Sequence, residues 1–329
     1  MVDVPGEGTF MVVHQVDATE RTELEEAMMN VTENQAKLLF QIYPRHVLEA
    51  LAAQGDSIDM TSTAKSHDDV TIMFLDIVGF TSMSDQVAPS KVMALLTSLF
   101  SMMDHLADHH GVHKVEIAGD CYIVSGGILE AGADADGFYN VLDTHSPVDS
   151  AKRVFNFARD ALAGAAKIMM PHNDEPVTLR VGMHTGPCVS GLVGTKQPKF
   201  AIFGDTMNTA ARMESTGRPG RIQVSEATYA LLCGITSTEE WEPTGGVECK
   251  GKGCMQTHLW TPTQALELSC SLPADLLLTG VPRVSLLGTL TNLSTTLVKL
   301  GMSGRFKASA RFNDYPLDFA CTTERLDPD

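Results

Sequence analysis

The stretch VTIMFLDIV, residues 70–78, is an almost continuous apolar run that is rich in β-branched residues. Such a run indicates a buried β-strand. Its single charged residue, Asp76, lies near the end. A carboxylate in an apolar environment is costly unless something compensates its charge, and a metal ion is one such compensation. For Asp76 taken alone, a helix cap is the simpler interpretation.

A second acidic position follows in the next part of the chain. Two short apolar runs, 112–117 and 121–125, flank Gly119-Asp120, a dipeptide that is typical of a hairpin turn. If this hairpin neighbours the strand at 70–78, the carboxylates of Asp76 and Asp120 converge. Two hard oxygen ligands with open positions suit Mg²⁺ or Mn²⁺ that is bridged by substrate phosphates. Taken alone, Asp120 is an ordinary turn residue.

The remaining pattern predicts alternating helices and strands. Residues 131–150 contain Gly, Asp, Ser and Pro and are predicted to form a loop. The order β-α-β-β-α-β, with more elements after it, is typical of a ferredoxin-like α+β sandwich. The helices are expected at 89–109, 150–168, 206–215 and 226–233, and the later strands at 177–183, 222–224, 241–249 and 255–260.

Candidate ligands for a nucleotide lie on the later elements. Asn208 and Arg212 are four residues apart, so they share one face of the helix at 206–215. A neutral hydrogen-bonding group and a fixed cation can hold a sugar and a phosphate. Lys250, in a Lys/Gly turn, and Arg180, at a strand, are further candidates for triphosphate contacts. Each of these residues taken alone is equally explained as a solvated surface group.

Composition narrows the class of protein. The chain has 329 residues and a formal net charge of −17, which disfavours binding to a nucleic acid backbone. A triphosphate site in such a chain needs metal ions and local basic residues. The seven cysteines are scattered, which predicts reduced thiols and a cytoplasmic protein. No window approaches the ~20 apolar residues of a membrane-spanning helix, although a longer protein that contains this chain can still be membrane-attached.

The first fifty residues form a region of their own. Leu24, Met28, Val31, Gln35, Leu38 and Ile42 follow one another at alternating spacings of four and three residues. This spacing predicts a short parallel coiled coil, and the alternative is one amphipathic helix packed on its own domain. The segment from Gly8 to Glu25 resembles the last strand and exit helix of a PAS sensor domain. We therefore expect the end of an upstream sensor at 1–16 and a coiled-coil linker at 17–51.

Five segments together carry a wider resemblance. They are the strand that ends at Asp76, the hairpin with Asp120, RVGMHTG at 180–186, GDTMNTAARMEST at 204–216 and KGKG at 250–253. Over about residues 43–260 the chain resembles the class III adenylyl and guanylyl cyclases. This resemblance implies a catalytic domain at 66–262. Residues 263–329 form a tail without a recognisable motif.

The resemblance implies a role for each candidate residue. Asp76 and Asp120 are expected to hold two Mg²⁺ or Mn²⁺ ions, with help from the Ile77 carbonyl. Arg212 is expected to stabilise charge on the α-phosphoryl group in the transition state, and Asn208 to orient the ribose. The other two cations, Lys250 and Arg180, are expected to hold the β- and γ-phosphates.

In this family the active site lies between two subunits. One chain is expected to supply Asp76, Asp120 and Arg180. The other is expected to supply Glu116, Asn208, Arg212 and Lys250. Because this chain carries both sets, the resemblance implies a homodimer with two equivalent sites.

The residue at 116 separates the two activities of the family. Glu116 matches the guanylyl cyclases, in which a carboxylate accepts hydrogen bonds from N1–H and N2–H₂ of guanine. The second base-reading position is Ala201, where guanylyl cyclases usually have Cys and adenylyl cyclases usually have Asp. Specificity is then expected to depend on Glu116 and on the backbone near Ile202. GTP is the expected substrate and cyclic GMP the product. The alternatives are an adenylyl cyclase and a catalytically silent regulatory homologue.

Overall fold

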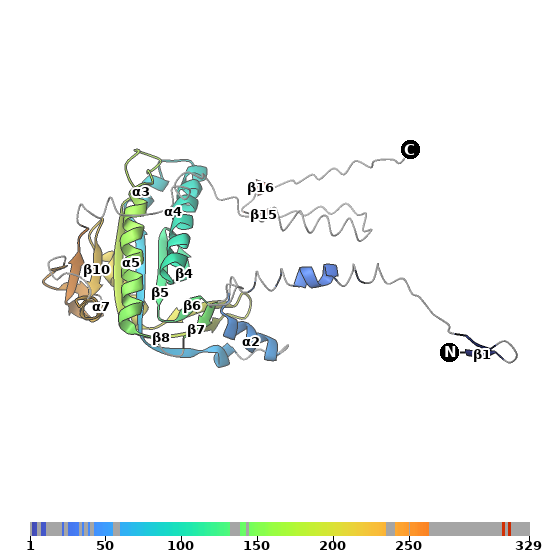
Figure 1. Ribbon diagram of the computed structural model, residues 1–329. Coiled ribbons are helices and arrows are strands. Elements are labelled where there is room, and N and C mark those ends of the chain that lie inside the picture. The colour runs from blue at the N-terminus through green and yellow to red at the C-terminus, as the bar shows by residue number, and fades with distance from the viewer. Residues whose placement is uncertain are drawn as a thin grey trace, which may run out of the picture. The chain divides into compact units, whose positions relative to one another are not determined.

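The described residues of the computed structural model fall into two units, of which the larger, residues 33–282, contains the packed fold (Figure 1). The structure describes residues 2–4, 8–10, 22, 26–32, 35, 39, 43–54, 60–131, 139–142, 145–234, 241–249, 251–262, 311–312 and 315–316.

One twisted sheet organises the larger unit. Its strands run in the order β11-β14-β10-β8-β3-β5-β4, and β9 pairs with the far half of β8. The pair β8–β10 is parallel and the others are antiparallel. Their bounds are β3 Lys65–Ile77, β4 His113–Ala118, β5 Cys121–Gly126, β8 Leu179–Val193, β9 Lys199–Phe203, β10 Ile222–Ser225, β11 Trp241–Pro243 and β14 Thr257–Trp260.

Helices cover both faces of this sheet. Helices α4 and α5 pack together and run along the strands (Figure 1). Helix α6 contacts β8 and β3. The bounds are α2 Arg45–Gln54, α3 Phe80–Ser84, α4 Pro89–His110, α5 Pro147–Ala165, α6 Asp205–Ser215 and α7 Glu226–Leu232, with a 3₁₀ turn at Met60–Thr63. The expected ferredoxin-like α+β fold is confirmed.

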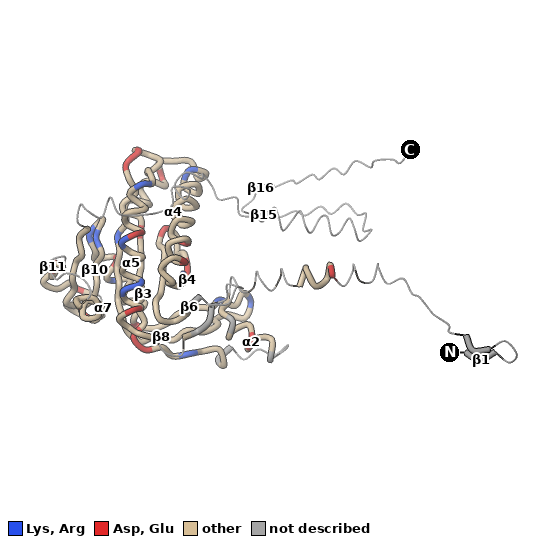
Figure 2. Tube along the Cα trace, in the orientation of Figure 1, with Lys and Arg blue, Asp and Glu red and all other residues tan. Residues whose placement is uncertain are grey.

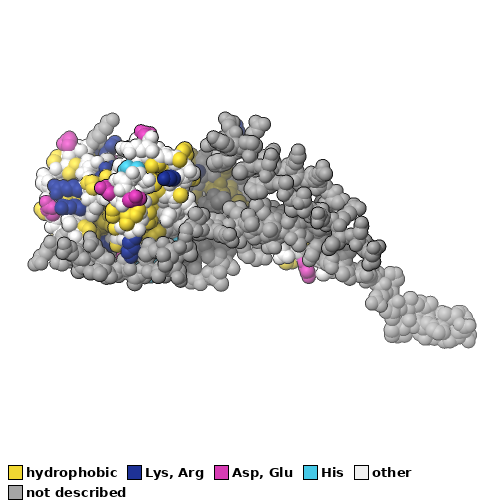
Figure 3. Space-filling model, turned by 90° about the horizontal axis from the view of Figure 1, so that it is seen from above, with side chains coloured by type: hydrophobic (Ala, Val, Ile, Leu, Met, Phe, Trp, Pro, Cys, Tyr) yellow, Lys and Arg dark blue, Asp and Glu magenta, His cyan; other side chains and the backbone are white. Residues whose placement is uncertain are grey.

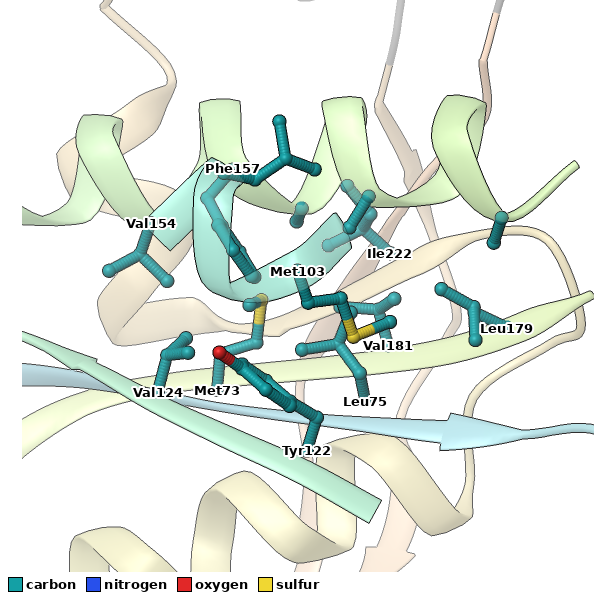
Figure 4. Packing of buried hydrophobic residues seen from close by; sticks show 14 of the residues in the cluster. Met73, Leu75, Met103, Tyr122, Val124, Val154, Phe157, Leu179, Val181 and Ile222 are labelled. Atoms are coloured by element: carbon teal, nitrogen blue, oxygen red, sulfur yellow. The ribbon is translucent and has the colours of Figure 1, made fainter. Parts of the chain in front are cut away.

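The alternation of side chains along β3 creates two cores. Met73, Leu75 and Ile77 face the main cluster with residues of α4 and α5, and Figure 4 shows Met73 and Leu75 packed near Met103 and Phe157. The other set, Val70, Ile72 and Phe74, faces a second cluster that includes residues of α2 and α6. Successive strand residues point to opposite faces, so both sets must be apolar. Asp76 continues the second set by one further step.

The end of the predicted linker is packed against the catalytic sheet. The Tyr43 hydroxyl donates to the Pro198 carbonyl at 2.5 Å. The rings of His46 and Phe200 meet edge to face with their centroids 6.0 Å apart. Val47 of α2 is fully buried in the second cluster. The residues from Tyr43 onward therefore form part of the packed unit, ahead of residue 66, where the sequence predicts the catalytic domain to begin.

The smaller unit comprises Met1–Thr32 and Arg283–Asp329. Strands β1 (Val2–Val4) and β2 (Gly8–Phe10) pair antiparallel, as do β15 (Arg311–Phe312) and β16 (Tyr315–Pro316). Residues 26–32 are helical, and the Met28 and Val31 side chains of the proposed seam are exposed. Three other seam residues, Leu24, Leu38 and Ile42, lie outside the described residues, so the coiled coil stays a prediction.

Three predictions of secondary structure were wrong. The strand expected at 241–249 is divided into β11 and β12 (Val247–Cys249), which belong to different sheets. The segment 131–150, expected to be a loop, contains β7 (Tyr139–Val141), which pairs with β6 (Leu129–Ala131), and the first turn of α5. Strands β6 and β7 have three residues each, which is too few for an alternation of apolar and polar residues to be recognised in the sequence. The strand expected at 177–183 extends to Val193 as β8, because its far half, residues 189–193, pairs with β9. A further small hairpin joins β12 and β13 (Gly253–Met255).

The surface of the described residues is mixed in charge. Figure 2 shows Lys or Arg and Asp or Glu along α5, and Figure 3 shows acidic, basic and apolar side chains interspersed on the visible face. The net charge of −17 therefore does not form a continuous acidic surface on that face. Within the described part of the chain, no helix is both long and apolar enough to cross a membrane.

Candidate active site

Asp76 occupies the last position of β3 that faces α6. Its side chain is 24% exposed. Burial raises the pKa of Asp76, and repulsion from Asp120 adds to the rise, whereas Arg180 opposes it. Helix α3 begins after Gly79, which has a φ of 78° and gives no side-chain cap. Asp76 is therefore not the cap of this helix, and its carboxyl group is available for another role.

Asp120 lies at the tip of the β4–β5 hairpin. The strands close at Ala118 and Cys121, and Gly119 takes a φ of 68°, which suits a two-residue turn. Strand β5 pairs with β3, with Leu75 opposite Tyr122, and repulsion between the Asp76 and Asp120 carboxylates contributes to the raised pKa of Asp76, so the two carboxyl groups lie near each other. Burial, together with the negative charges of Asp76, Glu214 and Asp120, raises the pKa of the Cys121 thiol to about 12. Three carboxyl groups therefore surround this corner of the sheet.

Arg180 is the cation at this corner. Its Cα lies opposite that of Asp76 in the β3–β8 register, so both side chains emerge on the same face. The Nη2 atom donates to Asp76 Oδ2 at 3.0 Å, and Nε donates to Glu214 Oε1 at 2.6 Å. Arg180 is thus bound to two carboxylates of its own chain. One guanidinium and three nearby carboxyl groups leave a net negative charge when all are ionised.

The two aspartates fit a hard divalent cation. Both present carboxylate oxygens, and Asp76 is partly exposed and reachable. Within the described residues, no three His, Cys, Asp or Glu side chains are arranged to hold a metal ion by themselves. The pair therefore suits ions that take their other ligands from water or from a phosphate, as Mg²⁺ typically does.

A second polar contact joins a residue of β4 to a residue of β9. The Lys199 ammonium group donates to Glu116 Oε2. Along β9, Phe200 and Ile202 are buried, and Lys199 and Ala201 share the opposite face. Glu116 is one-third exposed, so its carboxylate remains accessible.

Helix α6 presents two different faces. Asn208 and Arg212 are exposed, four residues apart on the same side. Among the described residues, no carboxylate forms an ion pair with the Arg212 side chain, whereas Glu214 on the other side of the helix is buried. Lys250 lies outside the described residues. The neighbouring Lys252 forms an ion pair with Asp205 at the start of α6.

A buried histidine near α6 gives a pH-dependent stability. His184 Nδ1 forms a hydrogen bond of 2.7 Å with Ser225 Oγ, and burial lowers the pKa of His184 to about 4, with a smaller contribution from Lys252. The unfolded chain takes up a proton near pH 6.5, before the folded chain does. Stability is therefore fully present above pH 6.5 and is lost as the pH falls toward 4.

The unfolding free energy of the unsubstituted chain is expected to be lower at pH 5 than at pH 7, and His184 should account for about 2 kcal/mol of this difference. In His184→Gln the difference should be smaller by that amount. Urea unfolding at both pH values measures it. The same exchange at the exposed His172 should leave the decrease unchanged, and an equal decrease in all three proteins would contradict the assignment.

Comparison with known proteins identifies this arrangement. The family model described as "Adenylate and Guanylate cyclase catalytic domain" matches residues 62–261. The chain belongs to this family. It is 38% identical to mouse (Mus musculus) guanylate cyclase D over 243 residues, which are 74% of this chain and 20% of that protein. The chain therefore spans about a fifth of the length of the curated relatives it matches.

Solved cyclase domains share the fold. The guanylate cyclase domain of RhGC from Catenaria anguillulae, crystallised in complex with GTP, is 34% identical with a TM-score of 0.51, over 61% of this chain and 100% of that one. The catalytic core of a rhodopsin-guanylyl cyclase with converted specificity, in complex with ATPαS, is also 34% identical with a TM-score of 0.51, over 61% of this chain and 98% of that one.

Two residues of this cyclase domain were missed by the sequence analysis. Lys199 precedes Ala201 by two positions, so the two residues share one face of the strand. The alternation of side chains could therefore have identified Lys199, a cation in an acidic chain, as a candidate site residue. Glu214 is one of the two acidic residues of α6, and only the packing of this helix against β8 shows that it is buried. Its pairing with Arg180, 34 residues away, has no local signal in the sequence.

Proposed function

We propose that the chain is the catalytic region of a guanylate cyclase that converts GTP to 3′,5′-cyclic GMP and pyrophosphate. The 3′-oxygen of the ribose forms a bond to the α-phosphorus as the bond from that phosphorus to the pyrophosphate oxygen breaks. The 3′-hydroxyl loses its proton, and pyrophosphate departs with the bonding electron pair. The nucleophile belongs to the substrate, so the protein has to position and neutralise charge.

Asp76 and Asp120 would hold two Mg²⁺ or Mn²⁺ ions, with the Ile77 carbonyl as a further ligand. Such ions lower the pKa of the attacking hydroxyl and neutralise the leaving pyrophosphate. The convergence of the two carboxyl groups at one end of β3 supports this role.

The remaining polar residues would act on the substrate directly. Arg212 would stabilise the charge that develops on the α-phosphoryl group, and Asn208 would orient the ribose. Lys250 and Arg180 would bind the β- and γ-phosphates. For Arg180 this role requires that the guanidinium release Asp76, because Asp76 is its partner in the substrate-free chain.

We also propose a homodimer with shared active sites. Asn208 and Arg212 face outward from α6, whereas Asp76 and Arg180 are bound to each other. A second copy could therefore bring its own exposed pair to the carboxylates of this chain. A closed two-fold dimer produces two equivalent sites in this way.

The observation that carries the choice of base is the ion pair between Glu116 and Lys199. Guanine offers two adjacent donors, N1–H and N2–H₂, which match two carboxylate oxygens, and its O6 accepts from the ammonium group. Adenine offers one donor and one acceptor on the corresponding edge. It would leave a carboxylate oxygen unpaired, and an unpaired buried polar group is strongly discriminating.

Adenylate cyclase activity is the second candidate. Ala201 has no polar atom in its side chain, so it discriminates against neither base. A similar core with converted specificity binds ATPαS. A silent regulatory homologue is less well supported, because Asp76, Asp120, Asn208 and Arg212 are all present.

Glu116→Gln is expected to lower kcat/KM for GTP by about a hundredfold, because the amide turns a donor toward one of the guanine donors. The rate with ATP should change much less. Steady-state rates with both nucleotides measure the effect, and the exposed Glu175→Gln serves as the control. An unchanged ratio of GTP to ATP rates would contradict the role of Glu116.

The wider organisation is also a proposal. We propose an upstream PAS-like sensor that ends at 1–16, a coiled-coil linker at 17–51 whose last part, from Tyr43, packs against the larger unit, a catalytic domain at 66–262 and a tail at 263–329. Reduced cysteines fit a cytoplasmic catalytic region, and the five cysteines in the described residues are all free thiols. Attachment of the full-length protein to a membrane is compatible with this arrangement.

A further inference from the structure

Glu214 is a buried carboxylate next to the proposed metal ligands. Helix α6 comes unusually close to β8 at Gly182, where an added Cβ atom would overlap the backbone of Met213 and Glu214. Gly182 and Arg180 are two residues apart and point to the same face of β8. The missing side chain at 182 therefore lets α6 place Glu214 beside Arg180. The Glu214 side chain is only 11% exposed there.

The guanidinium of Arg180 joins this carboxylate to Asp76. Its Nε donates to Glu214 Oε1 at 2.6 Å and its Nη2 donates to Asp76 Oδ2 at 3.0 Å. The two contacts use different nitrogen atoms, so one can break while the other persists. The planar, always charged guanidinium is suited to holding two carboxylates in this way.

We propose that Glu214 is a positioning residue that anchors Arg180, so that Arg180 serves as the counter-ion of Asp76 until a divalent cation replaces it. The inference rests on the proposed function in taking Asp76 as a metal ligand. A guanidinium and a metal ion compete for the negative charge of Asp76, because both are cations. Arg180 has to release Asp76 when the metal ion binds.

The anchor determines how easily this exchange occurs. With Glu214 present, Arg180 keeps a charged partner after it leaves Asp76, and its Nη2 atom becomes available to a phosphate. Without Glu214, Asp76 would be the carboxylate partner that remains to Arg180, so Arg180 would compete more strongly for Asp76. Glu214 thereby assists cation binding through Arg180 and without contacting the cation.

Substitution of Glu214 by aspartate separates this role from that of a simple negative charge. Glu214→Asp keeps the charge but shortens the side chain by one methylene, so its bond to Arg180 Nε is lost. We expect the dissociation constant for Mn²⁺ to rise about threefold to tenfold, as is typical of coupled residues in one ion-pair network. The constant is measured on the metal-free chain without nucleotide, from the electron paramagnetic resonance signal of free Mn²⁺.

A double-mutant cycle tests whether the effect passes through Arg180. In the Arg180→Gln background, Glu214→Asp should change the dissociation constant for Mn²⁺ by less than about twofold. Glu242→Gln, which removes an exposed partner of Arg221, is the control and should have no effect in either background. If Glu214→Asp does not fold, Glu214→Gln takes its place in the same cycle.

Two results would overturn the inference. One is an unchanged Mn²⁺ dissociation constant in folded Glu214→Asp, and the other is an equal shift in both backgrounds. Because nucleotide is absent, either result can occur in a chain that still makes cyclic GMP, which would leave the proposed function standing. An unsubstituted chain that binds no Mn²⁺ would overturn the metal assignment of Asp76 as well.

Discussion

Replacing Asp76 by asparagine is expected to lower the conversion of GTP to cyclic GMP by at least about a thousandfold. The amide keeps the shape of the side chain but removes the negative charge that a divalent cation needs. The partner of Arg180 Nη2 becomes neutral at the same time. Cyclic GMP formed by the purified variant, at saturating GTP and Mn²⁺, gives the size of the loss.

A matched variant on the same strand separates lost chemistry from lost structure. Asp68 lies near the other end of β3 and is exposed. Asp68→Asn should retain nearly full activity, and both variants should unfold at temperatures close to that of the unsubstituted chain. Substantial cyclic GMP production by folded Asp76→Asn would show that Asp76 does not hold a catalytic metal ion.

Mixing two inactive variants is expected to restore activity. Asp76→Asn lacks the proposed metal ligand and Arg212→Ala lacks the proposed transition-state cation, so each homodimer should be inactive. In a mixed dimer, one site receives both defects and the other receives none. With random exchange of subunits, half of the dimers are mixed, so the mixture should regain about a quarter of the unsubstituted activity.

The control for this experiment combines two defects from the same set. A mixture of Asp76→Asn and Asp120→Asn should stay inactive, because every site takes both carboxylates from one chain and so lacks one of them. Subunit exchange is checked with differently tagged chains. An inactive Asp76→Asn and Arg212→Ala mixture, despite proven mixed dimers, would contradict the shared site.

The sequence correctly predicted those helices and strands whose apolar residues recur at a regular spacing or whose ends are marked by turn residues. The run at 70–78 is strand β3, and the turn at Gly119-Asp120 joins β4 and β5. Helix α4 ends with Gly111 in a left-handed conformation, one residue beyond its last turn. The hairpin β6–β7 was missed because each strand has only three residues and no alternation to detect.

The candidate site shows a similar division. Residue type and spacing pointed to Asp76 and Asp120, and the structure brings them together. The partners of the polar groups were not predictable, because they join segments that are distant in sequence. Lys199 lies 83 residues from Glu116, and Arg180 lies 104 residues from Asp76. Such pairs depend on strand register and on the approach of α6 to β8.

The most direct test of the proposed function is the cyclic product that the purified chain forms from GTP and from ATP, each with Mg²⁺ and with Mn²⁺. Cyclic GMP from GTP with little cyclic AMP from ATP is the predicted result, and it would show that Glu116 and Lys199 select guanine without a polar side chain at 201. Mainly cyclic AMP, or no product from a folded dimer, would contradict the proposal that this chain is a guanylate cyclase.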